Sequence, residues 1–390
     1  MSLPLNPAFP ATFAPPVMAA RRWLQETTLP EGLALVNLSQ AAPVAPPPPG
    51  LRAAMARAVE DDPGIHLYGP VLGQPALREA LARRSAAIYR GTVAAAQVAI
   101  TAGCNQAFCA AIAALAGPGD EVILPVPWYF NHAMWLGLQG IVARPLRLDA
   151  ALMPDPADAA KLINGRSRAI VLVSPNNPTG AEYPPALIAE FAALAAQHGL
   201  ALILDETYRD FHTSDGPPHA LFTDPDWDEV LIHLYSFSKA YRLTGHRVGA
   251  ILAAPRLIGE IEKFLDTVTI CPSGPGQMGA LWGLENLGAW LADEREEILR
   301  RRAAMIAGAE RLRGWQLIGC GAYFAWLRHP FDKASDALAR QLLTEKALLM
   351  LPGTMFRPDD DPAGARELRL AYANADSAMI DEVIARLEDA

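Results

Sequence analysis

The chain of 390 residues carries 33 lysines and arginines against 42 aspartates and glutamates, and its formal net charge is −9. This length allows about two or three ordinary domains, each with its own core. The basic residues are scattered and not clustered, so the chain lacks the electrostatic footprint of a nucleic-acid-binding protein. We therefore expect small-molecule chemistry and no nucleic-acid partner.

The cysteine content and the lengths of the hydrophobic runs indicate in which cellular compartment the protein is expected. The four cysteines form neither CxxC pairs nor a His/Cys ligand spacing, which predicts neither zinc nor a disulfide framework. The first residues lack a basic stretch ahead of an apolar one, so we expect no signal peptide. The longest apolar run, residues 107–117, is about half of the roughly 20 residues that a spanning helix needs. We expect a cytoplasmic protein that does not enter a membrane.

The N-terminal part of the chain is divided by prolines. The tract "APVAPPPPG" at residues 42–50 predicts an extended connector, because proline is excluded from helix interiors. We take residues 1–45 as an N-terminal arm that joins a smaller domain. Apolar periodicity then predicts helices over residues 50–61 and 74–90, with a glycine-punctuated loop at 64–73 between them.

From residue 98 onward, short apolar runs alternate with helical stretches. Near-continuous Val/Ile/Leu runs are typical of strands buried on both faces, and intervening helices make them βαβ units of an α/β fold with a mostly parallel central sheet. The runs lie at residues 98–101, 121–125, 169–174, 201–205 and 230–236. From about residue 285 a long charged helix, short strands and a closing helix predict a smaller α+β domain. We expect a large domain at 46–284 and a small one at 285–390.

Ligands of open α/β sheets bind beyond the carboxyl ends of the strands, so the residues after each run are candidates for a site. Gly103 follows the first run and opens a helix, whose N-terminal N–H groups favour an anion such as phosphate. An ordinary strand-to-helix turn would also explain this glycine. Trp128 and Tyr129 follow the second run, where they either pack in the core or stack on a planar ring.

The third and fourth runs end in polar residues. The segment "SPNNPTG" at 174–180 holds Asn177 in a stiff proline-rich loop, although turn chemistry alone also accounts for these residue types. Asp205 ends the fourth run and Tyr208 follows it. A carboxylate at the end of an inner strand is costly unless it is paired with a cation, which favours a functional role for Asp205.

Lys239 follows the fifth run, close to the hydroxyl of Ser236. A lysine in a partly desolvated site loses its proton readily and becomes a carbonyl-reactive amine. Arg247 offers a planar fork suited to phosphate oxygens. Arg369 lies in a strand-like alternation and is either a solvated edge residue or a carboxylate clamp. One cofactor with a phosphate, an aromatic ring, a basic ring nitrogen and an aldehyde would use all these groups, and that molecule is pyridoxal phosphate.

Several motifs in order resemble the class I/II aminotransferases, which are fold-type-I pyridoxal-phosphate enzymes of the aspartate aminotransferase superfamily. The resemblance covers the chain from about residue 30 to its end and is carried by "SPNNPTG", "DETY", "SFSKAYRLTGHRVG" and "LRLAYA". It implies that Lys239 is the Schiff-base lysine and shuttles the substrate proton. It also implies that Asp205 keeps the pyridine nitrogen protonated, and that Tyr208 and Asn177 bind the phenolic oxygen of the ring.

The resemblance implies further contacts to the cofactor. Tyr129 is the better match for the residue that stacks on the ring, and Trp128 is the alternative. Tyr68 is similar to a tyrosine that reaches the phosphate in the neighbouring subunit, which implies a homodimer with the active site at the interface. The phosphate contacts within one chain would come from Gly103, Cys104, Asn105, Ser236 and Arg247.

At the positions that match the substrate-binding residues of the family, this sequence departs from the family pattern twice. Arg369 matches the arginine that clamps the substrate α-carboxylate, with Asn177 assisting it. In "VNLSQAAP", however, Ala41 replaces the glycine of the family pattern, and its methyl group could narrow the pocket or only shift the loop. The basic residue that aspartate-specific members carry at the position of Asn105, or near residue 273, is also missing. We therefore expect a neutral or aromatic amino acid.

These expectations define one leading function and two alternatives. The leading function is an aminotransferase that moves an amino group between an L-amino acid and a 2-oxo acid by a ping-pong mechanism. A β-eliminating carbon–sulfur lyase could use the same cofactor site. A non-catalytic amino-acid-sensing module is the third reading, but such modules typically carry a DNA-binding appendage, which we do not expect here.

Overall fold

A seven-stranded sheet forms the larger part of the molecule. The computed structural model describes residues 3–389. The strand order is β2-β8-β7-β6-β5-β3-β4, and all neighbouring pairs are parallel except those of β8, so the expected mostly parallel sheet is confirmed. The strands are β2 (Val98–Thr101), β3 (Glu121–Val126), β4 (Val142–Arg147), β5 (Ser167–Val173), β6 (Ala201–Asp205), β7 (Leu231–Ser236) and β8 (Gly249–Leu252).

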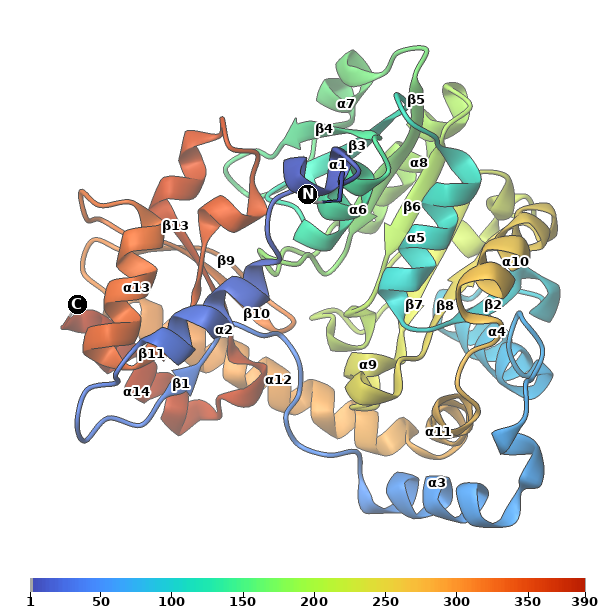
Figure 1. Ribbon diagram of the computed structural model, residues 1–390, viewed down its shortest axis with the longest axis horizontal. Helices are drawn as coiled ribbons and strands as arrows, with labels where there is room; N and C mark the ends of the chain where they lie inside the picture. Colours follow the sequence, from blue (N-terminus) through green and yellow to red (C-terminus); the bar gives the residue numbers. More distant parts are fainter. Residues whose placement is uncertain (1–2, 390) are drawn as a thin grey trace.

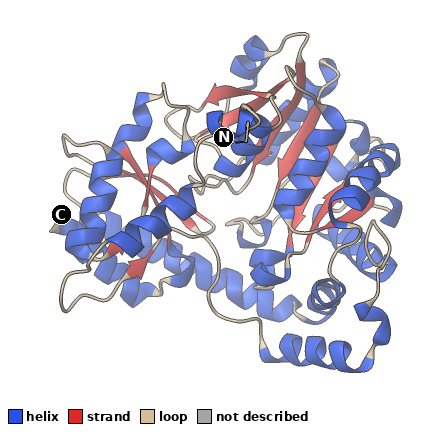
Figure 2. Cartoon of the chain, in the orientation of Figure 1, coloured by secondary structure: helices blue, strands red, loops and turns tan. Residues whose placement is uncertain are grey.

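The inner strands are apolar because both of their faces are covered by helices (Figure 2). Successive side chains of a strand point to opposite faces. Ile170 and Leu172 of β5 accordingly lie in one core, and Val171 between them lies in another. The helices that contact the strands of this sheet are α4 (Pro75–Tyr89), α5 (Cys104–Leu115), α6 (Phe130–Leu138), α7 (Pro156–Leu162), α8 (Pro185–Gln197) and α10 (Pro255–Thr269). Helix α11 (Gly274–Asn286) packs on α4, and α3 (Pro49–Asp61) packs on α11.

The predicted helices at 50–61 and 74–90 are confirmed within one residue at each end. The proline tract does not stay extended to its end, because α3 already begins at Pro49. Proline fits the first turn of a helix, where its missing N–H would have no partner.

A four-stranded antiparallel sheet of order β12-β13-β10-β9 forms the smaller part and lies beside the large sheet (Figure 1). This confirms the expected second α+β unit, and the boundaries at residues 45 and 284 stay a prediction. Its elements are α12 (Gly288–Ala309), β9 (Gln316–Gly321), β10 (Phe324–Arg328), α13 (Ser335–Lys346), β11 (Leu348–Leu349), β12 (Leu351–Pro352), β13 (Glu367–Ala371) and α14 (Ser377–Glu388).

The N-terminal residues run across both parts. Helix α1 (Ala8–Ala11) contacts α6 of the large part, and α2 (Pro16–Glu26) contacts β12 of the small part. Strand β1 (Val36–Asn37) pairs in parallel with β11. The N-terminal segment therefore passes from one part to the other before α3 begins (Figure 1).

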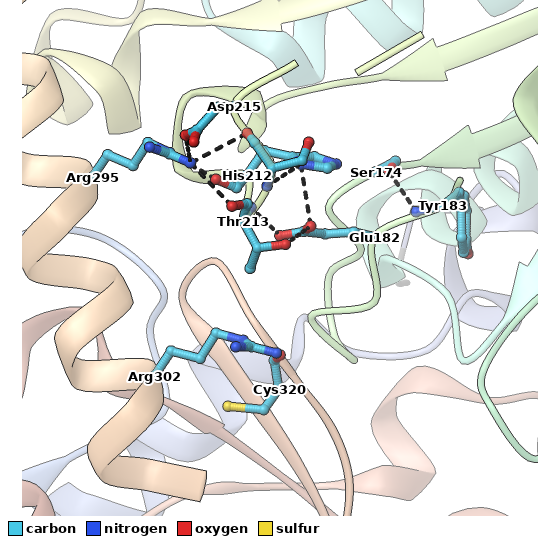
Figure 3. Close-up of polar contacts among 10 residues, drawn as sticks. Ser174, Glu182, Tyr183, His212, Thr213, Asp215, Arg295, Arg302 and Cys320 are labelled. Atoms are coloured by element: carbon cyan, nitrogen blue, oxygen red, sulfur yellow. Dashed lines mark hydrogen bonds and ion pairs between the residues drawn. The ribbon is translucent and has the colours of Figure 1, made fainter. Parts of the chain in front are cut away.

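The loop that follows β6 is tied to α12 by a polar cluster (Figure 3). Arg295 of α12 donates to the carbonyl oxygens of His212 (2.8 Å) and Thr213 (3.1 Å) and to a carboxylate oxygen of Asp215 (2.9 Å). Glu182 accepts from the backbone N–H of Thr213 at 2.9 Å. These bonds join the long helix of the small part to two loops of the large sheet. Within residues 3–389, every helix is too short or too polar to cross a membrane.

Candidate active site

A cavity of about 340 Å³ lies beyond the carboxyl ends of β5, β6 and β7, next to β13. It brings together most residues that the sequence singled out. The predicted residues that line it are Ala41, Cys104, Asn105, Tyr129, Asn177, Asp205, Tyr208, Ser236, Lys239, Arg247 and Arg369. Gly103, Trp128 and Tyr68 do not line it in this chain.

Lys239 is held in the cavity by a short helix, α9 (Phe237–Ala240), directly after β7. The hydroxyl of Ser236 caps this helix by accepting from the backbone N–H of Ser238 at 3.2 Å. The Nζ atom of Lys239 donates to the carbonyl oxygen of Ala41 at 2.7 Å. Burial, together with the charges of Arg247 and Arg369, lowers the pKa of Lys239 to about 8. This environment makes the neutral, nucleophilic amine accessible near neutral pH.

Asp205 is buried at the end of β6 and is held by three groups. One carboxylate oxygen lies 3.4 Å from Nε2 of His132, and the other accepts from the backbone N–H of Thr207 at 3.0 Å. The thiol of Cys104 also lies within hydrogen-bonding distance, at 3.6 Å. Burial alone would raise the pKa of Asp205, but the bonds and charge of His132 and the bonds of Thr207 outweigh it and lower the pKa.

His132, which contacts the carboxylate of Asp205, was missed by the sequence reasoning. It lies in the first turn of α6 and stacks on Phe108 of α5, with ring centroids 3.8 Å apart. Its only sequence signal is the spacing of three residues from Tyr129, which places both near the start of one helix. The contact with Asp205 joins segments 73 positions apart, and no local pattern specifies it.

An anion cradle lies where α5 begins. Gly103 has a positive φ of 89°, and a Cβ atom there would lie 2.1 Å from Nη2 of Arg247. Only glycine therefore allows the guanidinium to approach the helix start. Arg247 is fixed by donating to the carbonyl oxygen of Thr244 at 3.0 Å. The first N–H groups of α5, at Cys104 and Asn105, have no partner within the helix and point at the same place.

Arg369 is almost fully buried in β13 and faces the cavity from the small part. Its Nη1 donates to Oδ1 of Asn177 at 3.0 Å, and its Nη2 donates to the carbonyl oxygen of Ser39. The Nε–H group is buried and has no partner among the described residues. Burial lowers the pKa of Arg369 to about 10. A buried guanidinium with a free N–H suits a carboxylate ligand.

The aromatic residues of the site separate into two groups. Tyr129 lines the cavity and donates from its hydroxyl to Asn105 at 3.2 Å. Tyr208 also lines the cavity and packs against Tyr323 and Phe324, with centroids 5.4 and 5.0 Å away. Trp128 packs instead in the core around α5. The geometry therefore favours Tyr129 over Trp128 as the ring that faces a ligand.

A buried cluster beneath the site resembles a metal centre in composition. Ligand atoms of Glu206, His219 and His233 lie within 4.8 Å of one another. However, Nδ1 of His219 accepts from the backbone N–H of Leu221 at 3.1 Å, so in the neutral ring Nε2 carries the proton and cannot bind a metal. His233 and Tyr89 contact the same oxygen of Glu206. The cluster is therefore a hydrogen-bonded network that fixes the end of β6.

The family assignment agrees with the fold and this geometry. The family model "Aminotransferase class I and II" matches residues 34–387, and the chain belongs to this family. The chain is similar to an aromatic aminotransferase of Arabidopsis thaliana, with 31% identity over 75% of each chain. It is also similar to a methionine aminotransferase of Escherichia coli, with 27% identity over 96% of this chain and 97% of that one.

Solved structures show the same fold over the whole chain. An Escherichia coli methionine aminotransferase structure covers 100% of both chains at 25% identity, with a TM-score of 0.90. The aspartate aminotransferase of Thermus thermophilus with maleate also covers 100% of both chains, at 26% identity and a TM-score of 0.90.

Proposed function

We propose that this aminotransferase uses pyridoxal phosphate and exchanges the amino group of a neutral or aromatic L-amino acid with a 2-oxo acid. The observation that carries the proposal is one cavity that contains the Arg247 cradle, the low-pKa Lys239, the anionic Asp205 and the buried Arg369. Each of these groups matches one part of the cofactor or the substrate. The site supports the alternative sensing function less well, because a sensor needs no amine of lowered pKa.

The residues present fit pyridoxal phosphate. A Cβ at Gly103 would fill the cradle, so this glycine leaves room for the phosphate, and the first N–H groups of α5 together with Arg247 would bind it. Asp205, held anionic by His132, would pair with the protonated ring nitrogen. When bound, the cofactor supplies a reactive aldehyde carbon and a ring that accepts electrons.

The chain's own residues would perform the remaining steps. Lys239 would act as the nucleophilic amine and would carry the proton removed from the substrate α-carbon. Arg369 and Asn177 would bind the α-carboxylate and orient the α-carbon. Tyr208 would donate from its hydroxyl, because burial raises its pKa well above the usual value and keeps it protonated.

The cavity wall supports a neutral or aromatic substrate. Among the described residues, its only cations are Lys239, Arg247 and Arg369, which all have roles at the cofactor or the α-carboxylate. Among the described residues that line the cavity, no further cation remains for a side-chain carboxylate. Pro15, Val17 and Phe130 complete an apolar part of the wall. The names of the Arabidopsis and Escherichia coli relatives agree with this preference.

We also propose a homodimer in which Tyr68 reaches the partner's cofactor. Tyr68 is 81% exposed and lies beside Leu67, which is 72% exposed. Their loop contacts a second loop through the backbone N–H of Gly69, which donates to Sγ of Cys271 at 3.4 Å. Ile270 in that loop is 42% exposed. These residues form an exposed apolar surface suited to a second copy of the chain.

Replacement of Lys239 by alanine tests the proposed function. Lys239→Ala should keep the fold and bind pyridoxal phosphate without a covalent bond, while turnover falls by about a thousandfold or more. Lys263→Ala, at an exposed lysine, is the control. Full turnover in Lys239→Ala would contradict the proposal. Glutamate formation from an amino acid and 2-oxoglutarate separates the aminotransferase from a β-eliminating lyase, which would release pyruvate and ammonia.

A further inference from the structure

The backbone around Gln40 is fixed against the catalytic groups. The carbonyl oxygen of Ser39 accepts from Arg369, and that of Ala41 accepts from Lys239 at 2.7 Å. On the far side, Asn374 accepts from the backbone N–H of Val44 at 2.8 Å. Gln40 therefore lies between the two carbonyls that contact the proposed carboxylate clamp and the proposed nucleophile. Gln40 lines the cavity and is exposed.

The amide of Gln40 has only one possible orientation. Its Oε1 accepts from Nη2 of Arg21 in α2 at 3.1 Å. Arginine has donors and no acceptor, so the oxygen of the amide must face Arg21 and the NH₂ group must face away. The NH₂ group has no partner among the described residues. The positive charge of Arg21 also polarises the amide and strengthens its N–H groups as donors.

Asn131 presents the complementary group on the same cavity. Its Nδ2 donates to the hydroxyl oxygen of Tyr129 at 2.9 Å, and this hydroxyl donates its single proton to Asn105 at 3.2 Å. Because Asn131 uses its Nδ2 as the donor in this series of hydrogen bonds, its Oδ1 is left as an acceptor without a partner among the described residues. The wall therefore offers one free amide donor and one free amide acceptor.

We infer that this wall recognises an amino acid with a carboxamide side chain, of which glutamine is the longer natural example. The inference rests on the proposed aminotransferase function and narrows its substrate class. A carboxamide has both groups that this wall would need, a carbonyl oxygen to accept from Gln40 and an NH₂ group to donate to Asn131. A carboxylate would instead place a negative charge beside the oxygen of Asn131, and an apolar side chain would form a hydrogen bond with neither wall amide.

The first experiment compares side chains of equal shape in the cofactor-loaded protein. The loss of visible cofactor absorbance in a single half-reaction is measured with L-glutamine, with its apolar isostere L-homoleucine and with L-glutamate. The second-order rate constant for glutamine should exceed those of the other two by about tenfold, as expected for two modest hydrogen bonds. Gln40→Met, which keeps the volume and removes one of the two hydrogen bonds, should reduce the glutamine-to-homoleucine ratio by about threefold.

A second measurement does not depend on turnover. Glutaramate, which is glutamine without its amino group, should raise the melting temperature of the loaded protein more than isoheptanoate does, and Gln40→Met should reduce this difference by about half. Gln139→Met, at an exposed glutamine outside the cavity, is the matched control and should keep both preferences.

The two proposals fail in different ways. If no amino acid reduces the visible absorbance, the proposed aminotransferase function is wrong. If homoleucine reacts as fast as glutamine, or if Gln40→Met leaves the preference undiminished, the carboxamide inference is wrong while the aminotransferase function stands.

Discussion

Lys239 shows how the site changes the chemistry of a single residue. Its ammonium form loses hydration in the cavity and is repelled by Arg247 and Arg369, so its pKa falls to about 8 from the usual 10.5. The carbonyl oxygen of Ala41 offsets only part of this cost. The methyl group of Ala41 has no part in this bond. The replacement of the family's glycine therefore leaves the backbone contact intact.

The lowered pKa of Lys239 predicts a pH-dependent stability. In the cofactor-free protein, burial of the charged Lys239 destabilises the fold, and this destabilisation is fully present below about pH 8. It is relieved as the pH rises to about 10.5, because in this range the unfolded state binds more protons than the folded one. Lys239→Met should therefore raise the free energy of unfolding by about 2 kcal/mol near pH 7. This gain should mostly disappear near pH 10.

Urea unfolding of the wild type and the variant at both pH values measures the effect. Lys263→Met, at an exposed lysine, corrects for general surface changes. A gain of equal size at both pH values would show that the charge of Lys239 is not its cause.

Among the structural elements, the start of α5 allows two effects of a substitution to be told apart, namely loss of stability and loss of cofactor affinity. Gly103 and Gly119 have nearly equal φ values of 89° and 87°, but only Gly103 faces a neighbour, Arg247. Either replacement by alanine should cost about 1–2 kcal/mol of stability through backbone strain. Gly103→Ala should in addition displace Arg247 and weaken the binding of pyridoxal phosphate by tenfold or more, an estimate of about one lost charged hydrogen bond.

Fluorescence titration of the cofactor-free variants measures this difference in affinity. Equal affinity in the Gly103→Ala and Gly119→Ala variants would exclude the cradle from phosphate binding.

The loop after β5 meets β9 of the small sheet with unusually close backbones. A Cβ at Gly180 would lie 2.3 Å from the backbone nitrogen of Gly321, whereas Gly199, which also has a positive φ, has no atom within 4 Å. Both alanine variants carry similar backbone strain. Gly180→Ala should therefore be less stable than Gly199→Ala by about 1–3 kcal/mol, the cost of overpacking. Chemical denaturation of both variants tests this, and equal midpoints would contradict the close approach.

At the scale of the whole molecule, the exposed surface around Tyr68 predicts the assembly. The mass in solution should be twice the chain mass of 41.9 kDa. Tyr68→Ala should weaken cofactor binding although Tyr68 does not line the cavity of its own chain, because its hydroxyl would contact the phosphate of the partner. Analytical ultracentrifugation and cofactor titration measure these two effects. A monomeric protein with full cofactor affinity would overturn the proposed interface.

The strands of the large sheet could be predicted to very different degrees. The runs that became β2, β3, β5, β6 and β7 are buried on both faces and therefore continuously apolar. Strand β4 was not predicted, because it pairs only with β3 at the edge and is half exposed, so its sequence "VARPLR" is not apolar. Strand β8 was missed because it begins with glycine, which interrupts the run of β-branched and aliphatic residues.

The apolar runs of the sequence are enough to indicate which residues stand at strand ends. Asp205, Lys239 and Asn177 each follow such a run, and parallel strands bring their carboxyl ends to one edge. The partners of these residues follow from the tertiary structure alone. His132 lies beside Asp205, Ala41 bonds to Lys239 across 198 positions, and Gln40 is oriented by Arg21. These contacts depend on how helices and loops pack over the sheet, and local patterns of hydrophobicity do not encode that packing.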